Sequence, residues 1–211
     1  MTLSELSRRE RKKEETRRRI FEAAVDLFRA KGFDATTVDE ITERADVGRG
    51  TFFNYFPRKE AVLAYLSESR LVQAEENASD LLTAASPVRE KLVELYLHAA
   101  SAYEEDRELS RFVFAEWLKR GFAPTRDAGL RWEQLVLAIL AQGRESGELR
   151  ADVTAVRAAA LLSGAYISTV YEWLYCPDDH DCASVPDLRS ELSARIGIVV
   201  DGLSAHAAVR S

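Results

Sequence analysis

The segment Thr36–Glu60, which reads TTVDEITERADVGRGTFFNYFPRKE, constrains the fold of this chain more closely than any other stretch. Thr37 is followed three residues later by Glu40, which is the spacing of a capping box that starts a helix at residue 38. Asp46 stands where a sharp turn needs a left-handed residue, a conformation that Asp tolerates better than most. Pro57 ends a second helix, because the residue before a proline avoids the helical region. The segment therefore predicts a helix-turn-helix.

The second helix of this motif has an inner and an outer face. Phe52 and Phe56 are four residues apart and should face inward with Val47, while Gly48 is a weak N-cap. The outer rim is then formed by Arg49, Gly50, Thr51, Phe53, Asn54 and Tyr55. Arginine pairs with guanine, asparagine with adenine and a threonine methyl with thymine, while tyrosine or arginine can contact phosphate. This rim predicts entry into a DNA major groove.

A third helix is predicted before the motif, over Thr16–Lys31. Its apolar residues recur at helical spacing and form one face. They are Ile20, Ala23, Ala24, Leu27 and Phe28. Gly32 is placed as the C′ residue, and Phe33 can pack on Phe28 as in a Schellman ending. Three helices with a shared apolar face predict a small DNA-binding bundle.

Residues 16–66, with the run IFEAAVDLFRAKGFDATTVDEITERADVGRGTFFNYFPRKEAVLAYL, resemble the N-terminal domain of TetR-family transcriptional regulators. The resemblance covers about the first third of the chain. It implies that Arg49–Phe56 is the recognition helix. It also implies that Thr37 and Lys59 hold phosphates and that Tyr55 rests on the DNA backbone.

The chain departs from the family pattern at three positions. Asp46 stands where the family usually has Gly, and Gly48 where Ser or Thr usually caps the recognition helix. Phe52 stands where Leu is common. These departures leave the expected fold intact but bear on which bases or phosphates are contacted.

The formal net charge of −6 is distributed unevenly. Residues 1–60 hold 14 Lys and Arg against 12 Asp and Glu, whereas the remainder holds 15 against 23. The cations near the amino end are Arg8, Arg9, Arg11, Lys12, Lys13, Arg17, Arg18 and Arg19. Such an arm can reach phosphates or a minor groove. The alternative is a solvated, partly helical tail.

After residue 60 the sequence predicts helices throughout, because no alternating strand pattern or repeat occurs. The expected helices run over about 58–71, 86–103, 108–120, 126–146, 152–174 and 186–205. The fold class expected is all-α, with a three-helix DNA-binding domain followed by a helical bundle. The expected domains are a basic arm (1–15), a helix-turn-helix domain (16–60), and a ligand-binding and dimerisation domain (61–211).

The penultimate helix is apolar on more than one side and carries many small residues, so it should be buried. A second copy of the chain can bury it, and the resemblance implies a homodimer through the two C-terminal helices. A two-fold dimer would set two recognition helices about 34–36 Å apart, which matches a palindromic operator. The alternative is that this helix is the centre of a monomeric bundle.

The resemblance also implies a small effector inside the C-terminal bundle. Aromatic side chains suit an apolar pocket, so the candidate ligand contacts are aromatic. They are Tyr96, Tyr103, Phe114, Trp117, Trp132 and Tyr166. With few evident buried charges nearby, the expected effector is apolar or aromatic. The alternative is that these aromatics belong to the plain core.

Between the last two helices lies the run Cys176-Pro-Asp-Asp-His180-Asp-Cys182. Thiolates, imidazole and carboxylates can bind zinc or another metal, but this spacing matches no standard zinc pattern. Metal binding and redox sensing are the hypotheses for this run, and the competing interpretation is a polar loop. No metal and no cofactor is assigned.

Catalytic motifs are lacking, since the chain has no phosphate-binding glycine loop, nucleophile elbow or His-Glu-x-x-His pattern. No apolar run approaches the roughly 18 residues of a membrane span, and the start lacks the apolar segment of a secretory signal. The chain is therefore expected to be a cytoplasmic, non-enzymatic, dimeric repressor released from its operator by an effector. The alternatives are an activator of the same fold, or a helical protein-interaction module without DNA binding.

Overall fold

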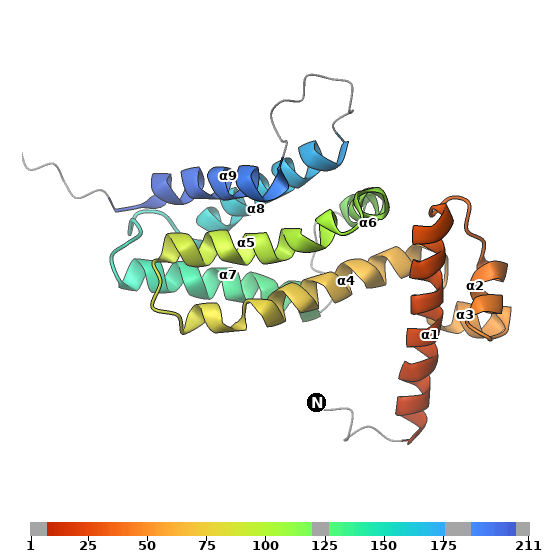
Figure 1. Ribbon diagram of the computed structural model, residues 1–211. Coiled ribbons are helices and arrows are strands. Elements are labelled where there is room, and N and C mark those ends of the chain that lie inside the picture. The colour runs from red at the N-terminus through yellow and green to blue at the C-terminus, as the bar shows by residue number, and fades with distance from the viewer. Residues whose placement is uncertain (1–7, 120–126, 176–186, 206–211) are drawn as a thin grey trace, which may run out of the picture. The chain divides into compact units, whose positions relative to one another are not determined.

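The computed structural model describes residues 8–119, 127–175 and 187–205, and these residues are mainly helical (Figure 1). In chain order the helices are α1 (Arg8–Lys31), α2 (Val38–Arg44), α3 (Arg49–Tyr55), α4 (Glu60–Asn77), η1 (Ser79–Leu82), α5 (Val88–Glu104), α6 (Arg107–Lys119), α7 (Asp127–Glu145), α8 (Ala155–Tyr175) and α9 (Leu188–Leu203). Extended pairing in the described residues is limited to an isolated bridge between Leu149 and Ser204. The predicted all-α fold class is confirmed. Among the described helices, none is both long and apolar enough to cross a membrane.

Packing divides the chain into two compact units. Unit 1 comprises Met1–Ser67 and Glu108–Gly121, and unit 2 comprises Glu68–Arg107 and Phe122–Ser211. Most of α6 therefore belongs with the first three helices, although it follows α5 in the chain. The sequence placed functional domain boundaries after residues 15 and 60. The division by packing is a different kind of boundary, so the functional boundaries stay a proposal.

Unit 1 has one hydrophobic core, to which α1, α2, α3, α4 and α6 contribute. Its most deeply buried members include Ile20, Ala24, Phe28, Ile41, Phe52, Phe56, Val62, Leu63, Leu109 and Val113. The predicted inner face of the recognition helix is confirmed, because Phe52 and Phe56 are buried and Val47 packs against the same core. This core fixes the short helices α2 and α3, which could not form stably on their own.

The first helix begins at Arg8, so the predicted start at Thr16 is wrong. A side-chain pair across the predicted boundary accompanies the earlier start, because Arg17 lies 3.9 Å from Glu14, one turn before it. Pairs at this spacing stabilise helices. Charge-rich residues that the sequence left open as an arm or a tail are thus part of a continuous helix.

The predicted ending of α1 is confirmed. Gly32 has a positive φ of 87°, and its N–H donates to the Phe28 carbonyl at 2.9 Å. The Phe33 ring packs on the Phe28 ring, with centroids 4.9 Å apart. This hydrophobic contact accompanies many helix endings that pass through a left-handed glycine.

Unit 2 is a bundle in which α8 packs on α9, α5 on α9, α7 on α8 and α5 on α7. Fully buried side chains fill its centre, among them Leu92, Leu95, Ile139, Leu140, Leu162, Leu174, Leu192 and Ile196. Asp187 caps α9 by accepting from the Ser190 N–H at 2.9 Å. The predicted start of α8 at Asp152 is wrong, because Asp152 pairs with Arg150 and the helix begins at Ala155.

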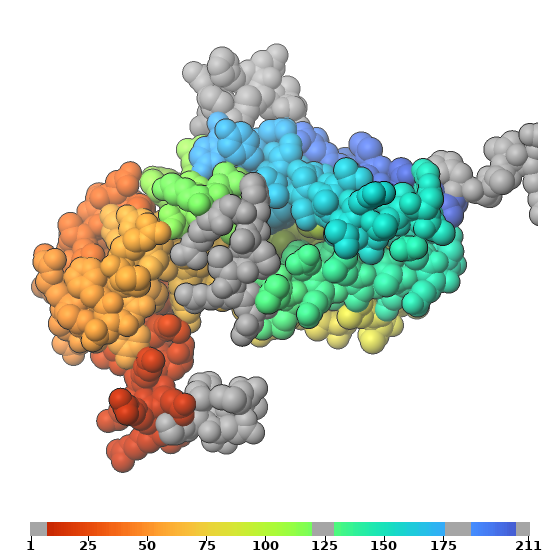
Figure 2. Space-filling view, turned by 180° about the vertical axis from the view of Figure 1, so that it is seen from behind, coloured from red at the N-terminus to blue at the C-terminus, as the bar shows by residue number. Residues whose placement is uncertain are grey.

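The α8 helix is buried on one side only within a single chain. Leu162, Val170 and Leu174 are fully enclosed, whereas Val156 is 68% exposed and Leu161 is 57% exposed. The surface of α8, cyan to light blue in Figure 2, is open in this view. The expectation that α8 is buried nearly all round is therefore not met by one copy of the chain.

Candidate nucleic-acid interface

The α2 helix starts with the predicted capping box. The Thr37 side chain accepts from the Glu40 N–H at 3.3 Å, and the Thr37 N–H donates to the Glu40 carboxylate at 2.8 Å. Two N–H groups that a helix start would otherwise leave unpaired are satisfied. Thr37, predicted to contact phosphate, is exposed at this helix start.

A sharp turn joins α2 to α3. Asp46 has a φ of 51°, which is the left-handed conformation that the sequence predicted. The N–H of Val47 donates to the Thr42 carbonyl at 3.0 Å and closes the turn. Gly48 is the N-cap of α3 and makes no side-chain capping bond, as expected for a residue without a side chain.

The predicted DNA-reading rim of α3 faces outward. Arg49, Gly50, Phe53 and Asn54 are exposed, with 44% of the Phe53 surface open. The remaining two members, Thr51 and Tyr55, are half-buried. The Phe53 ring contacts the buried Phe52 ring, with centroids 5.4 Å apart, and remains partly open beside polar side chains. The rim thus combines donors, an amide and an apolar ring on one helix face.

Arg49 forms an ion pair with Asp39 on α2. The closest nitrogen–oxygen distance is 2.8 Å, and both side chains are more than 60% exposed. An exposed pair of this kind contributes little to stability. The guanidinium can therefore exchange Asp39 for a base edge or a phosphate at small loss.

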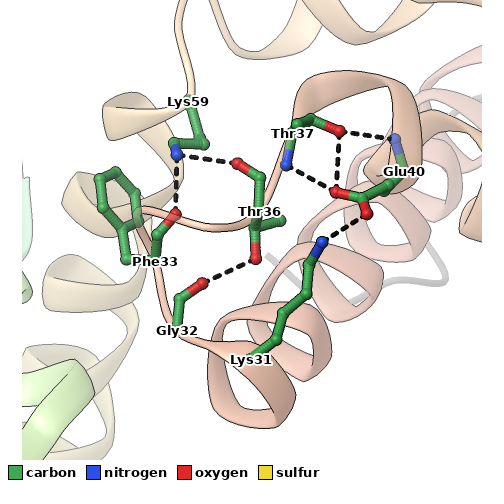
Figure 3. Close-up of polar contacts among 7 residues, drawn as sticks. All are labelled: Lys31, Gly32, Phe33, Thr36, Thr37, Glu40 and Lys59. Atoms are coloured by element: carbon green, nitrogen blue, oxygen red, sulfur yellow. Dashed lines mark hydrogen bonds and ion pairs between the residues drawn. The ribbon is translucent and has the colours of Figure 1, made fainter.

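A polar network joins the end of α1, the start of α2 and the start of α4 (Figure 3). Lys31 forms an ion pair with the Glu40 carboxylate, which also accepts from the Thr37 hydroxyl at 2.8 Å. The hydrogen bond from Lys31, followed by those from Thr37, lowers the pKa of Glu40 to about 2. The Thr36 hydroxyl donates to the Gly32 carbonyl at 2.8 Å.

Lys59 completes this network from the α4 side. Its ammonium donates to the Phe33 carbonyl at 2.7 Å and to the Thr36 carbonyl at 2.8 Å, and it lies 4.2 Å from the centroid of the Phe33 ring. The sequence predicted a phosphate contact here and missed these bonds, because the carbonyls lie 26 and 23 residues away in the chain. Two of the three donors of this ammonium are thus used within unit 1.

Arg58 is a further residue that sequence reasoning did not single out. Its guanidinium donates to the Glu116 carboxylate of α6 at 2.7 Å, and only 3% of the Glu116 side chain is exposed. This contact ties α6 to the residues directly after α3. No local pattern could have revealed it, since the partners are 58 residues apart.

Four of the six predicted ligand contacts lie in unit 2 and form an aromatic cluster. The Tyr96 ring lies 6.0 Å from Trp132 and 5.5 Å from Tyr166, and the Tyr166 hydroxyl donates to the Ala99 carbonyl at 3.2 Å. The Tyr103 hydroxyl is hydrogen-bonded to Tyr166. Aromatic groups are therefore concentrated between α5, α7 and α8.

The Tyr96 hydroxyl is unusual within this cluster. It is buried, and its contact with the Ser163 side chain falls short of a well-formed hydrogen bond. Burial raises the pKa of Tyr96 to about 12 and raises that of Tyr166 well above its ordinary value. Both phenols thus stay protonated at neutral pH, and the Tyr96 hydroxyl can still donate to a better-placed acceptor.

The other two predicted ligand contacts, Phe114 and Trp117, lie on α6. Both belong to unit 1, and their ring centroids are 5.6 Å apart. Phe114 is almost completely buried, whereas Trp117 is half-buried. The structure thus divides the predicted ligand residues between the units. The Cys176, His180 and Cys182 run lies outside the described residues.

Comparison with known proteins adds a family assignment to this geometry. The family model described as bacterial regulatory proteins, tetR family, matches residues 20–66. An uncharacterised HTH-type transcriptional regulator of Bacillus subtilis, YdeS, is 30% identical over 189 residues, which cover 86% of this chain and 90% of YdeS. Sequence similarity therefore extends well beyond the helix-turn-helix.

Solved structures show the same fold. FadR of Thermus thermophilus, a TetR-family transcriptional repressor in complex with lauroyl-CoA, is 31% identical with a TM-score of 0.70. The match covers 92% of this chain and 98% of FadR. RolR in complex with resorcinol is 23% identical with a TM-score of 0.63, covering 93% of this chain and 91% of RolR, and at this identity it supports the fold alone.

Proposed function

This chain belongs to the TetR family of bacterial regulatory proteins, and from this membership we propose that it is a dimeric repressor released from its operator by a small effector. The outward-facing rim of α3, held by the buried Phe52 and Phe56, is the observation that carries the proposal. The proposed activity is occupation of DNA, with no catalytic step. The proposed location is the cytoplasm, where bacterial operators are found.

The rim residues are assigned different roles. Asn54 and Arg49 read adenine and guanine edges, while Thr51 and Phe53 contact thymine methyl groups or sugars, and Gly50 allows close approach of the backbone. Tyr55, Thr37 and Lys59 contact phosphates. Base contacts carry the specificity, whereas phosphate contacts set the register of the helix in the groove.

The exposed apolar surface of α8 and α9 supports the dimer. Val156, Leu161 and Tyr171 on α8, with Ile198 on α9, are each more than half exposed in the single chain. A second copy would cover these side chains and remove their apolar surface from water. Two-fold pairing would present two recognition helices to a palindromic site.

The effector is proposed to be apolar, and a long-chain acyl-CoA is the first candidate. The support is the similarity to Thermus thermophilus FadR, whose structure holds lauroyl-CoA. The buried Tyr96 hydroxyl, which has only a poor contact with Ser163, suits an effector with an oxygen acceptor, such as a thioester carbonyl. An aromatic effector, such as the resorcinol held by RolR, is the competing candidate.

Release follows if the effector binds more tightly to a conformation whose recognition helices no longer fit both half-sites. The shift in DNA affinity then equals the difference in effector affinity between the two conformations. By reciprocity, operator DNA must weaken effector binding by the same factor.

The test is salt-dependent binding of the purified protein to DNA taken from beside its own gene, against random DNA of equal length. The expected result is a preference of at least about a thousandfold for one fragment. Equal, weak binding to this fragment and to a genome-wide fragment library would overturn the regulator function.

The effector is tested by adding lauroyl-CoA or resorcinol, in separate samples, to the complex of protein and operator fragment. Release by resorcinol alone would replace the acyl-CoA assignment with an aromatic effector.

A further inference from the structure

The first half of α1 extends beyond the core of unit 1. We name residues 8–19, the part of α1 before its first buried residue, the basic extension. It carries eight Lys or Arg against three Glu in a chain whose net charge is −6. In both views of the molecule this end of α1 projects away from α2 and α3 (Figures 1 and 2).

The basic extension is a formed helix with an anchor in unit 1. The Thr16 hydroxyl donates to the Lys12 carbonyl at 2.9 Å. The Tyr65 hydroxyl donates to the Glu14 carboxylate at 3.5 Å, and the Arg17 guanidinium lies 5.3 Å from the centre of the Tyr65 ring. Its direction relative to the rest of unit 1 is therefore set at the Tyr65 contact.

This anchor lies next to the end of the recognition helix. The Tyr65 ring also contacts Phe56, the C-cap residue of α3, with centroids 5.9 Å apart. From Arg17 to Arg8 the helix rises about 13 Å. A major groove is about 12 Å wide, so this length is enough to reach a phosphate strand beside a groove that holds α3.

The cations of the basic extension lie on opposite sides of the helix. Arg9 and Lys13 are four residues apart and share one side, while Arg11 and Arg18 are seven apart and share the other. All four side chains are exposed. Positive charge is thus presented on both sides of the projecting helix.

We propose that the basic extension binds the phosphate backbone of duplex DNA outside the groove that α3 enters. The inference rests on the proposed function, and it adds a second, sequence-independent contact to the one made by the recognition helix. The charge of the extension complements DNA and contrasts with the acidic remainder of the chain.

An anionic membrane would attract the same charge, but the composition of the extension disfavours it. Residues 8–19 read RRERKKEETRRR and contain no apolar side chain. A helix that binds at a membrane surface buries an apolar face in the lipid. Duplex DNA requires no such face.

The experiment compares two double variants, Arg9→Gln/Lys13→Gln and Arg11→Gln/Arg18→Gln, with the native full-length protein. Binding to the operator fragment and to random duplex is measured between 50 and 200 mM salt, values chosen to span the usual range. The slope is that of the logarithm of the DNA-binding constant against the logarithm of the salt concentration. In the double variant on the DNA-facing side its magnitude should fall by about 2 to 4, because each protomer of the dimer loses two phosphate-binding cations. The preference for operator over random duplex should be kept.

The control variant, Arg89→Gln/Arg131→Gln, removes the same charge from exposed positions on α5 and α7 of unit 2. Its salt slope should match that of the native protein. Native slopes in both extension variants, or an equal loss in the control, would overturn the proposal. Binding to phosphatidylglycerol vesicles that the extension variants lose, with unchanged DNA slopes, would assign the surface to a membrane instead.

The two proposals fail in different ways. A native protein without preference for any fragment would end the regulator function, yet its slope on random duplex would still report on the extension. A native protein with strong preference and unchanged slopes in the variants would end only the proposal for the extension.

Discussion

The ammonium of Lys59 holds together the turn that precedes α2. It donates hydrogen bonds to the carbonyls of Phe33 and Thr36 and packs on the Phe33 ring. Thr36 is 1% exposed, so water could not readily replace the bond to its carbonyl if Lys59 were removed. Lys59 thereby positions the start of α2, and one remaining donor is free to meet a phosphate.

Lys59→Met should lower the free energy of unfolding by about 1–3 kcal/mol, because buried carbonyls lose their donor. Urea denaturation followed by circular dichroism measures this loss. Arg49→Gln is the matched control, since Arg49 is exposed and pairs only weakly with Asp39. The control should keep native stability and lose base preference, and equal stability of both variants would contradict the positioning role.

Glu40 should give the stability of unit 1 a characteristic dependence on pH. Its pKa is about 2 in the folded chain, lowered mainly by Lys31, against an ordinary value of 4.5. A carboxyl with a lowered pKa contributes its full stabilisation above its ordinary pKa. That contribution is lost as the pH falls from about 4.5 through 2.

The measurement compares urea midpoints at pH 7 and pH 3 for the native protein and Glu40→Gln. The variant should lose less stability between these pH values, because its amide does not titrate. Glu43→Gln, which removes the same charge from an exposed position on α2, is the control. A native-like loss in Glu40→Gln would show that the network of Figure 3 does not carry this dependence.

At the scale of elements, the turn between α2 and α3 stores backbone strain at Asp46. Its φ of 51° is unfavourable for residues with a side chain and natural for glycine. Asp46→Gly should therefore raise the free energy of unfolding by about 0.5–1 kcal/mol, and Asp46→Val should lower it by about 1–2 kcal/mol. Chemical denaturation of both variants checks the sign, and a destabilised glycine variant would contradict the strain argument.

Elements that depend on local signals could be predicted from the sequence. The Thr37–Glu40 spacing gave the start of α2, and the spacing of Phe52 and Phe56 gave the buried side of α3. Such signals lie within one or two turns of the helix they describe. The outward rim of α3 follows from the same spacing.

Features that depend on distant partners could not be predicted. The spacing of Leu109 and Val113 reveals an apolar face but not that it packs in unit 1. The charged residues before Thr16 read equally well as a tail, because the Tyr65 contact that anchors them is 51 residues from Glu14. The division of the predicted ligand residues between the two units also could not be predicted, because it depends on which distant residues α6 packs against.

At the scale of the whole molecule, the dimer is the assembly that operator binding requires. Leu161→Glu places a charge on the open face of α8, where the side chain is 57% exposed, so the single chain should still fold. The expected result is a monomer that binds one half-site weakly. Light scattering after size-exclusion chromatography gives the mass.

Leu130→Glu on α7 is the matched control, since Leu130 is 48% exposed and belongs to neither of the two helices proposed to form the interface. This variant should remain dimeric and keep operator binding. Dimers in both variants would place the interface elsewhere on the chain.

The placement of α6 affects how hybrid regulators can be assembled from this chain. Leu109 and Val113 fill part of the core around the DNA-reading helices, although they follow α5 in the sequence. A fragment cut after residue 67 would therefore carry a gap in its interior and an unshielded apolar surface. A sensor domain transplanted from another protein would have to bring a helix that fits this gap, so exchange of parts between such regulators is limited by the match at α6.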